Sequence, residues 1–262
     1  MGRRLGQHFL HSRTVLDALA RHAQIVPGEP LLEVGPGAGA LTARLLEAGA
    51  RVTAVEVDPL LAQALRERWE GHPHLRVVQA DILKADLSPQ ALFGAEAPYG
   101  VVANLPYYLS TPLLFRFVRS RRWYRRLLLM VQQEVGERLV ALPEQGKVYG
   151  ALSIAAHHAF EMRLVMSVPP GAFRPPPKVH SAVVSFVPRP ARLEPELEAR
   201  YLEHVKRLFT ARRKHMIGTL RRERPPWPPE ALTRVAAELG DRRAEALHPD
   251  EHLRIFQMLA CP

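Results

Sequence analysis

Residues 31–39 read LLEVGPGAG, in which an apolar run meets a loop of alternating glycines. Residues 31–34 are predicted to form a buried strand, and residues 41–46 begin a helical pattern directly after the loop. Glycines between a strand and a helix let the backbone approach a ligand, and the helix N-terminus favours negative charge on that ligand. The stretch therefore predicts a strand, a loop and a helix that together bind a small molecule.

The chain around this unit alternates apolar bursts with helical patterns. Such alternation is typical of repeated strand-helix units in a parallel sheet that is covered on both faces. A further helix is predicted through residues 60–68. The further predicted strands are residues 51–57, 75–80, 99–104, 127–131 and 182–187, the last as an edge or hairpin strand. The predicted fold class is thus α/β, with a large Rossmann-like sheet and helices on both faces.

A domain boundary is predicted at the end of the last strand. Pro188-Arg189-Pro190 interrupts that strand, and polar helical patterns replace strand formers beyond it. The prolines within residues 225–229 must separate two helices, because consecutive prolines forbid helical continuation. We therefore expect residues 1–188 to form the catalytic domain that contains the sheet, and residues 189–262 to form a small all-α domain.

The 262-residue chain is strongly basic. Its 36 Lys and Arg against 26 Asp and Glu give a net charge of +10, which favours a polyanionic partner such as nucleic acid. No apolar run approaches the roughly 20 residues of a membrane-spanning helix, and the N-terminus lacks a signal-peptide pattern. We expect a cytoplasmic, monomeric protein without a membrane partner, in which the single cysteine, Cys261, has no reactive role.

The glycine loop alone leaves its ligand open. Gly35, Gly37 and Ala40 also satisfy the loose dinucleotide fingerprint, so a dinucleotide and S-adenosylmethionine are equal alternatives, beside a plain tight turn. Ligands of open parallel sheets bind beyond the carboxyl ends of the strands. There, Glu56 can accept hydrogen bonds from both ribose hydroxyls, and Asp81 can accept one from an adenine amine. This order of acids suits an adenosine.

Helix capping is the alternative role for both acids. Asp and Asn are favoured at helix N-caps, and Asp58, directly before Pro59, is assigned to that role. A metal role is not indicated for the histidines, because the 12 His residues lack a repeated ligand spacing. The pair His157-His158 is accordingly interpreted as surface or packing residues.

The fourth strand runs into Asn104-Leu105-Pro106-Tyr107, the most specific signal in the chain. The tetrapeptide resembles the Asn-[Leu/Ile/Pro]-Pro-Tyr motif of methyltransferases that act on amino groups of planar bases. An exocyclic amine is a weak nucleophile with two hydrogens to donate. The Asn104 side-chain oxygen and the Leu105 carbonyl can accept both, which turns the nitrogen lone pair towards the methyl donor.

Pro106 and Tyr107 complete this predicted catalytic turn. The proline fixes the backbone direction and extends Leu105, and the tyrosine can stack on a base that is swung out of its helix or loop. The alternative is an ordinary strand-to-turn Asn followed by a packed tyrosine. The motif predicts catalysis by positioning, without a strong external base or a metal.

Further motifs make the chain similar to the KsgA family of rRNA adenine-N6,N6-dimethyltransferases over nearly its whole length. Residues 6–10, Gly-Gln-His-Phe-Leu, resemble the family's Gly-Gln-Asn-Phe-Leu, with His8 in place of the usual Asn. Residues 132–139, 149–153 and 169–179 also match closely, although Gln133 stands where Lys is common. The resemblance implies S-adenosylmethionine as the cofactor. Together with the strand ends, it assigns to cofactor binding Gln7, His8, Leu10, Gly35, Gly37, Glu56, Asp81, Ile82 and Asn104.

The resemblance also implies a target, which is two neighbouring adenines near the 3′ end of small-subunit rRNA, each dimethylated at N6. The proline-rich residues 169–179 flank the target base in the family, which makes Phe173 a second aromatic wall opposite Tyr107; the alternative is that Phe173 only packs on the core. The residues predicted to contact RNA are Arg116, Arg119, Arg122, Lys178, Lys206, Arg212, Arg213, Lys214, Arg221 and Arg222. Such charge runs otherwise form solvated helix faces.

Other functions remain open at this point. An Erm-type enzyme that methylates a large-subunit rRNA adenine shares the glycine loop and the Asn-x-Pro-Tyr logic. A non-catalytic RNA-binding factor of ribosome assembly would not need an intact Asn104 or Glu56. A nicotinamide oxidoreductase would leave both the tetrapeptide and the basic clusters unexplained. DNA adenine methylation is less favoured, because nothing resembles a sequence-reading DNA module.

Overall fold

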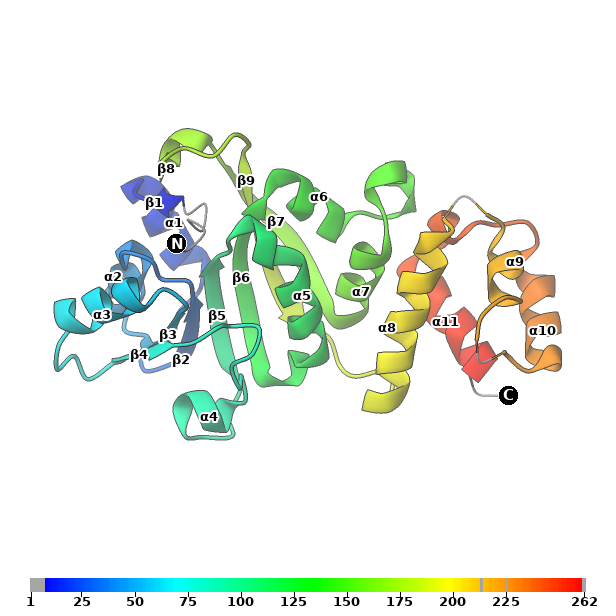
Figure 1. Ribbon diagram of the computed structural model, residues 1–262, viewed down its shortest axis with the longest axis horizontal. Helices are drawn as coiled ribbons and strands as arrows, with labels where there is room; N and C mark the ends of the chain where they lie inside the picture. Colours follow the sequence, from blue (N-terminus) through cyan, green and yellow to red (C-terminus); the bar gives the residue numbers. More distant parts are fainter. Residues whose placement is uncertain (1–7, 213, 225, 261–262) are drawn as a thin grey trace. The chain divides into compact units, whose positions relative to one another are not determined.

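The computed structural model describes residues 8–212, 214–224 and 226–260 (Figure 1). Gln7 and Arg213, two of the predicted contact residues, lie outside this part, and so do Cys261 and the side chain of Tyr107. Among the described residues, no helix combines the length and the apolar content that crossing a bilayer requires.

Contacts divide the chain into two compact units. The sheet unit comprises Met1–Gly136 and Glu161–Pro188, and the helical unit comprises Glu137–Phe160 and Arg189–Pro262. The break at Pro188 coincides with the predicted domain boundary. The segment Glu137–Phe160, which was expected in the first domain, groups instead with the C-terminal helices.

Within the described residues, seven strands form one mixed sheet in the order β4-β3-β2-β5-β6-β9-β7. The strands β4, β3, β2, β5 and β6 run parallel to one another, and β9 runs antiparallel to β6. The strands are β2 (Pro30–Val34), β3 (Arg51–Glu56), β4 (Leu75–Gln79), β5 (Tyr99–Asn104), β6 (Tyr124–Gln132), β7 (Phe160–Val168) and β9 (Ser181–Pro188). The predicted α/β class and six predicted strands are thereby confirmed.

The far edge of the sheet differs from the prediction. β7 was not predicted, and it lies outside β9, so β9 is an internal strand rather than an edge strand. Only the two end residues of β7, Phe160 and Val168, are buried, and the residues between them are exposed or half-buried. β7 begins directly after the preceding helix, with no glycine or proline between them, so the sequence does not mark the change from helical to strand periodicity.

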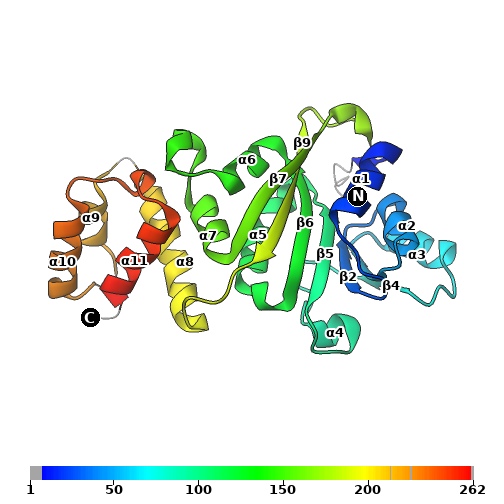
Figure 2. The same cartoon turned by 180° about the vertical axis from the view of Figure 1, so that it is seen from behind.

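Helices cover both faces of the sheet, as Figures 1 and 2 show from opposite sides. On one face, Leu19 and Leu45 from two helices pack against Leu31 and Ala54 of the strands. The residue before Ala54, Thr53, faces the opposite side, where its Oγ1 donates to the Leu92 carbonyl at 3.1 Å. The helices that begin in this unit are α1 (Arg13–His22), α2 (Ala40–Glu47), α3 (Pro59–Arg68), α4 (Pro89–Phe93), α5 (Ser110–Arg119) and α6 (Gln133–Val140).

The register of the parallel strands aligns their carboxyl ends. Val34 of β2 lies opposite Val55 of β3 on one side and opposite Ala103 of β5 on the other. The next residues, Gly35, Glu56 and Asn104, therefore leave the sheet at the same level. This shared level places the glycine loop, the predicted ribose acid and the predicted catalytic turn along one edge.

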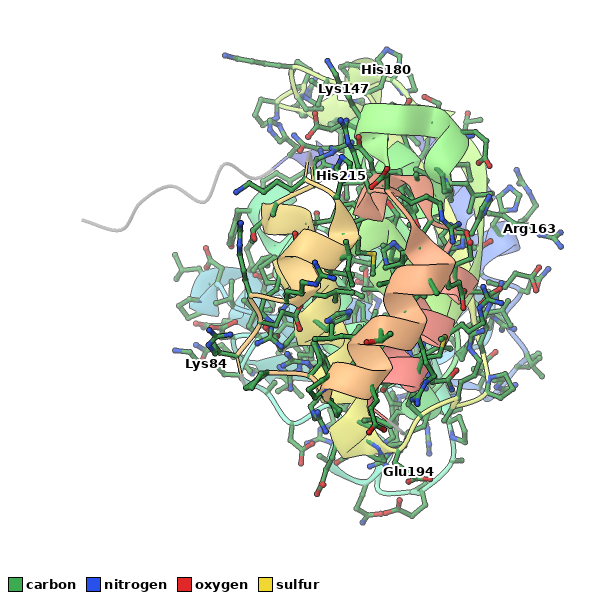
Figure 3. The ribbon with its side chains drawn as sticks, turned by 90° about the vertical axis from the view of Figure 1, so that its right-hand side faces the viewer. Lys84, Lys147, Arg163, His180, Glu194 and His215 are labelled. Carbon is green, nitrogen blue, oxygen red and sulfur yellow. The ribbon has the colours of Figure 1, made fainter. Side chains whose placement is uncertain are left out.

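The helical unit has its own apolar core, which includes Leu208, Val235 and Ile255. Two of its helices contain the predicted patterns, and the other C-terminal helices were not predicted. Figure 3 labels Glu194 at the start of α8 and His215 just beyond its other end. The helices are α7 (Ala151–Ala159), α8 (Pro195–Thr210), α9 (Met216–Leu220), α10 (Pro229–Leu239) and α11 (Pro249–Ala260).

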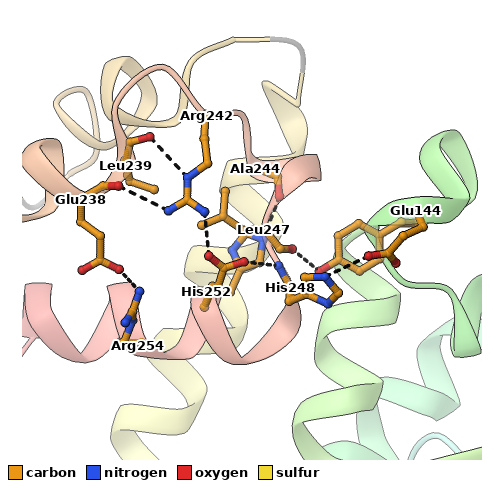
Figure 4. Close-up of polar contacts among 11 residues, drawn as sticks. Glu144, Glu238, Leu239, Arg242, Ala244, Leu247, His248, His252 and Arg254 are labelled. Carbon is orange, nitrogen blue, oxygen red and sulfur yellow. Dashed lines mark hydrogen bonds and ion pairs between the residues drawn. The ribbon is translucent and has the colours of Figure 1, made fainter.

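Polar contacts explain why residues 137–160 group with the C-terminal helices. The Tyr149 hydroxyl donates to the Leu247 carbonyl at 2.7 Å, and His248 lies 3.0 Å from Glu144 (Figure 4). Nearby, His158 is buried and pairs with Glu198 of α8 at 2.7 Å, which agrees with its predicted packing role. Buried polar groups such as Tyr149 and His158 need such partners, so their contacts tie the two segments into one unit.

Candidate active site

A cavity with a volume of about 330 Å³ lies beyond the carboxyl ends of the parallel strands. Gly35, Glu56, Asp81 and Asn104 all line it, and each follows or ends a different strand among β2, β3, β4 and β5. The chain passes from β2 to β3 on one side and returns to β5 on the other, so β2 and β5 flank the point at which the strand order reverses. Open α/β sheets bind their ligands at this point.

The glycine loop is held in place by the Glu56 carboxylate. Glu56 Oε2 accepts from the Gly37 N–H at 3.1 Å, and Oε1 accepts from the Asp58 N–H at 3.0 Å. Gly37 has φ +57°, and a Cβ there would lie 3.1 Å from the ring of Phe9. A larger residue at Gly37 is therefore disfavoured by both conformation and space. Glu56 orders the loop while it also lines the cavity.

Two further acids occupy the neighbouring turns. Asp58 caps α3, since its Oδ1 accepts from the N–H groups of Leu60 and Leu61, which confirms the capping role. Asp81 Oδ1 accepts from the Leu83 N–H at 2.9 Å, and this local bond shapes the turn after β4. Asp81 and the buried Ile82 both line the cavity.

Glu33 is a cavity acid to which the sequence reasoning assigned no role. Its side chain is only 1 % exposed, and its Oε2 has no hydrogen-bond partner among the described residues. Burial raises the pKa of Glu33 to about 8; the Thr42 hydroxyl opposes this shift and the nearby Glu56 charge adds to it. A carboxyl inside an apolar strand, directly before a glycine loop, is the sequence signal that could have identified it.

We expect Glu33→Gln to flatten the pH dependence of the free energy of unfolding. The folded-state pKa of about 8 exceeds the ordinary value of 4.5. Between pH 4.5 and pH 8, the carboxyl therefore stays protonated in the folded state but is ionised in the unfolded state. The stability from Glu33 is therefore complete below about pH 4.5 and is lost as the pH rises through 8. Each pKa unit corresponds to about 1.4 kcal/mol, so the loss amounts to a few kcal/mol.

Urea unfolding of both proteins across this pH range tests the effect. The wild type should lose stability relative to Glu33→Gln as the pH rises, because Gln cannot ionise. If the two stability profiles run parallel, Glu33 does not titrate in this range.

The predicted catalytic turn lies on the same cavity. Asn104 ends β5, and the Leu105 N–H donates to the Met130 carbonyl of β6 at 3.0 Å, which extends the sheet by one residue. The Pro106 carbonyl then accepts from the Leu109 N–H at 2.9 Å and closes the 3-10 turn η1 (Tyr107–Leu109). Asn104, Leu105 and Pro106 all line the cavity that Glu56 and Asp81 line.

Comparisons with known proteins agree with this arrangement. The family model described as "Ribosomal RNA adenine dimethylase" matches residues 2–260. The chain belongs to this family. It is an S-adenosylmethionine-dependent methyltransferase that acts on rRNA adenine.

Individual relatives of this dimethylase cover nearly its full length. The Geobacter metallireducens protein named "Ribosomal RNA small subunit methyltransferase A" is 41% identical, over 94% of this chain and 91% of its own. The protein of that name from Syntrophotalea carbinolica is 40% identical, over 98% and 96%.

Solved structures share the fold of the dimethylase. The 23S rRNA methyltransferase ErmE superposes with a TM-score of 0.72 at 29% identity, covering 96% of this chain and 99% of ErmE. A dimethyladenosine transferase from Plasmodium falciparum reaches a TM-score of 0.78 at 23% identity, over 95% and 96%.

The N-terminal motif and the proline-rich segment of the dimethylase meet at this cavity. β1 (Phe9–Leu10) pairs antiparallel with β8 (Phe173–Arg174), and a His8 ring nitrogen lies 2.7 Å from the Pro175 carbonyl. His8, Leu10 and Phe173 line the cavity, but Phe173 is only 4 % exposed and packs in the apolar core. This burial agrees with the alternative, in which Phe173 packs on the core. Tyr108, which the sequence reasoning passed over, lines the cavity and is 57% exposed.

The basic run of residues 116–126 is less available for RNA than its sequence indicates. Arg121 is buried, and Arg126 donates to the buried Glu29 carboxylate at 2.6 Å. Arg116 donates to backbone carbonyls of the sheet unit. Arg119, Arg122 and Lys178 are exposed, as phosphate contacts require.

The predicted basic cluster of the helical unit is also partly occupied by protein partners. Arg212 pairs with Glu245 at 2.6 Å and donates to the Lys147 and Gly146 carbonyls. Lys206 pairs with Glu203 at 2.8 Å. Among the described residues that are predicted to contact RNA in this unit, Lys214, Arg221 and Arg222 are exposed. Within the described ranges, no group of three or more His, Cys, Asp or Glu residues could hold a metal ion.

Proposed function

We propose that this dimethylase transfers two methyl groups to the N6 amine of each of two adjacent adenines near the 3′ end of small-subunit rRNA, in the small ribosomal subunit or its precursor. The observation that carries the proposal is that Asn104 and Leu105 line the same cavity as Glu56 and Asp81. The full-length relatives whose names specify the small subunit support the choice of rRNA.

The residues of the cavity fit S-adenosylmethionine. When it is bound, the cofactor supplies a methyl group on a positively charged sulfur. Glu56 would accept from the ribose hydroxyls, and Asp81 with the Ile82 backbone would hold the adenine. Glu33 brings a buried carboxyl with an unpartnered oxygen, and a cofactor cation bound beside it would lower its raised pKa and favour the charged carboxylate. The acids thus match an adenosine that carries positive charge.

The catalytic turn orients the amine of the target base. Asn104 Oδ1 and the Leu105 carbonyl accept its two hydrogens, so the nitrogen lone pair is directed towards the methyl donor. The bond from the Leu105 N–H to Met130 fixes the turn to the sheet, which limits movement of the acceptors. The buried side chains of Leu105 and Phe173 exclude water from the cavity.

Transfer of labelled methyl groups to purified particles tests this function. We expect incorporation into small-subunit particles that lack the modification, and nucleoside analysis should recover N6,N6-dimethyladenosine. Incorporation into large-subunit particles alone would favour the Erm-type activity, for which the likeness to ErmE is the specific support. Binding to small-subunit particles without any transfer would indicate a non-catalytic assembly factor.

A further inference from the structure

Arg116 occupies an unusual position for a residue in a basic run. It lies on α5, the helix that follows the catalytic turn directly, and its side chain is half-buried. Its Nη1 donates to the Ile82 carbonyl at 2.5 Å, and its Nη2 donates to the Ala85 carbonyl. The guanidinium therefore binds two backbone oxygens of one short segment as a fork.

The segment that Arg116 binds is the turn after β4. Asp81 and Ile82 of this turn line the cavity, and the Asp81 carbonyl accepts from the Lys84 and Ala85 N–H groups at 2.9 Å. The turn is neither strand nor helix, so side-chain contacts matter more for its position than they would in a regular element. Two charge-assisted hydrogen bonds from a fixed helix hold it against the sheet unit.

From this geometry we infer that Arg116 is a positioning residue for cofactor binding. It holds the Asp81–Ala85 turn in the conformation that presents Asp81 and Ile82 to the adenine, and it connects this turn to the helix that follows Asn104 and Leu105. The inference rests on the proposed function in that the cavity takes S-adenosylmethionine. It replaces the phosphate contact that the charge pattern alone predicted for Arg116.

Calorimetry with S-adenosylhomocysteine, in the absence of RNA, tests the inference. We expect Arg116→Gln to weaken binding roughly tenfold or more, because two bonds from a charged donor are lost. The affinity of Arg116→Lys should lie between those of the wild type and Arg116→Gln, since Lys keeps the charge but cannot donate to both carbonyls as a fork. Arg163→Gln is the matched control; Arg163 is exposed on β7, projects from the surface in Figure 3 and should leave the affinity unchanged.

Two further readouts separate positioning from a general loss of structure. Amide hydrogen exchange in Arg116→Gln should rise in the Asp81–Ala85 turn and stay unchanged in the strands. In methyl transfer, the KM for the cofactor should rise while the KM for RNA and the kcat at saturating cofactor stay near wild type. If Arg116→Gln fails to fold, the same readouts apply to Arg116→Lys.

The inference is overturned if Arg116→Gln binds S-adenosylhomocysteine like the wild type but binds RNA more weakly, since Arg116 would then contact phosphate. It is also overturned if the exchange rate rises evenly across the sheet unit. A wild type that binds S-adenosylhomocysteine but transfers no methyl group would contradict the proposed function and leave the role of Arg116 standing. A wild type that does not bind S-adenosylhomocysteine would contradict both.

Discussion

Asn104→Ala is expected to abolish methyl transfer, with a loss of at least about 100-fold, while cofactor binding is largely retained. The variant keeps the backbone of the catalytic turn, because the Leu105 N–H still donates to Met130. It loses the side-chain oxygen that accepts one hydrogen of the amine, so the lone pair is no longer directed towards the methyl donor. Labelled-methyl transfer to small-subunit particles measures the loss, and calorimetry with S-adenosylhomocysteine measures the retained affinity.

Asn104→Asp is the matched comparison for this variant. It keeps an acceptor oxygen at the same position, so we expect measurable transfer where the alanine variant shows none. Undiminished turnover of Asn104→Ala would remove Asn104 from the mechanism, whereas a parallel loss of cofactor affinity would make it a binding residue only.

Glu56→Ala is expected to weaken cofactor binding by about 100-fold, because it affects two kinds of contact. The carboxylate accepts from the Gly37 and Asp58 N–H groups, so its removal releases the glycine loop. The substitution also removes the acceptor for the ribose hydroxyls. Losing hydrogen bonds to a charged group costs about 1.5–3 kcal/mol each, which corresponds to roughly a tenfold change or more per bond.

Glu56→Gln separates the effect of the charge from the effect of the acceptor oxygens. The amide keeps one acceptor oxygen but removes the charge and the second acceptor, so calorimetry should place its affinity between those of the wild type and Glu56→Ala. A wild-type affinity in Glu56→Ala would show that the ribose binds elsewhere.

The parts of the site that follow from strand order were predictable from the sequence. Ligands of parallel sheets bind at the carboxyl ends of the strands. An acid that follows a predicted strand, such as Glu56 or Asp81, is therefore expected at the ligand site. The local capping bond of Asp58 could likewise be predicted from its neighbours. A role for Asn104 could be predicted because the tetrapeptide itself supplies the two acceptors for an amine, independent of tertiary contacts.

Features that depend on tertiary packing could not be predicted in this way. The raised pKa of Glu33 depends on how deeply the strand is buried. The role of Arg116 depends on a turn more than 30 positions earlier in the chain, and a run of arginines gives no sign of it. The grouping of Glu137–Phe160 with the C-terminal helices comes from contacts such as that between Tyr149 and Leu247. The edge strand β7 lacked a clean alternation of apolar and polar residues.

The proposed grip on the target amine can be seen in a crystal structure of the protein with S-adenosylhomocysteine and an adenine nucleotide. We expect the N6 amine to lie about 2.7–3.2 Å from both Asn104 Oδ1 and the Leu105 carbonyl oxygen, with the cofactor's sulfur facing that nitrogen across the cavity. An adenine bound with its N6 amine away from these two oxygens, or a cofactor bound outside the glycine loop, would contradict this proposal.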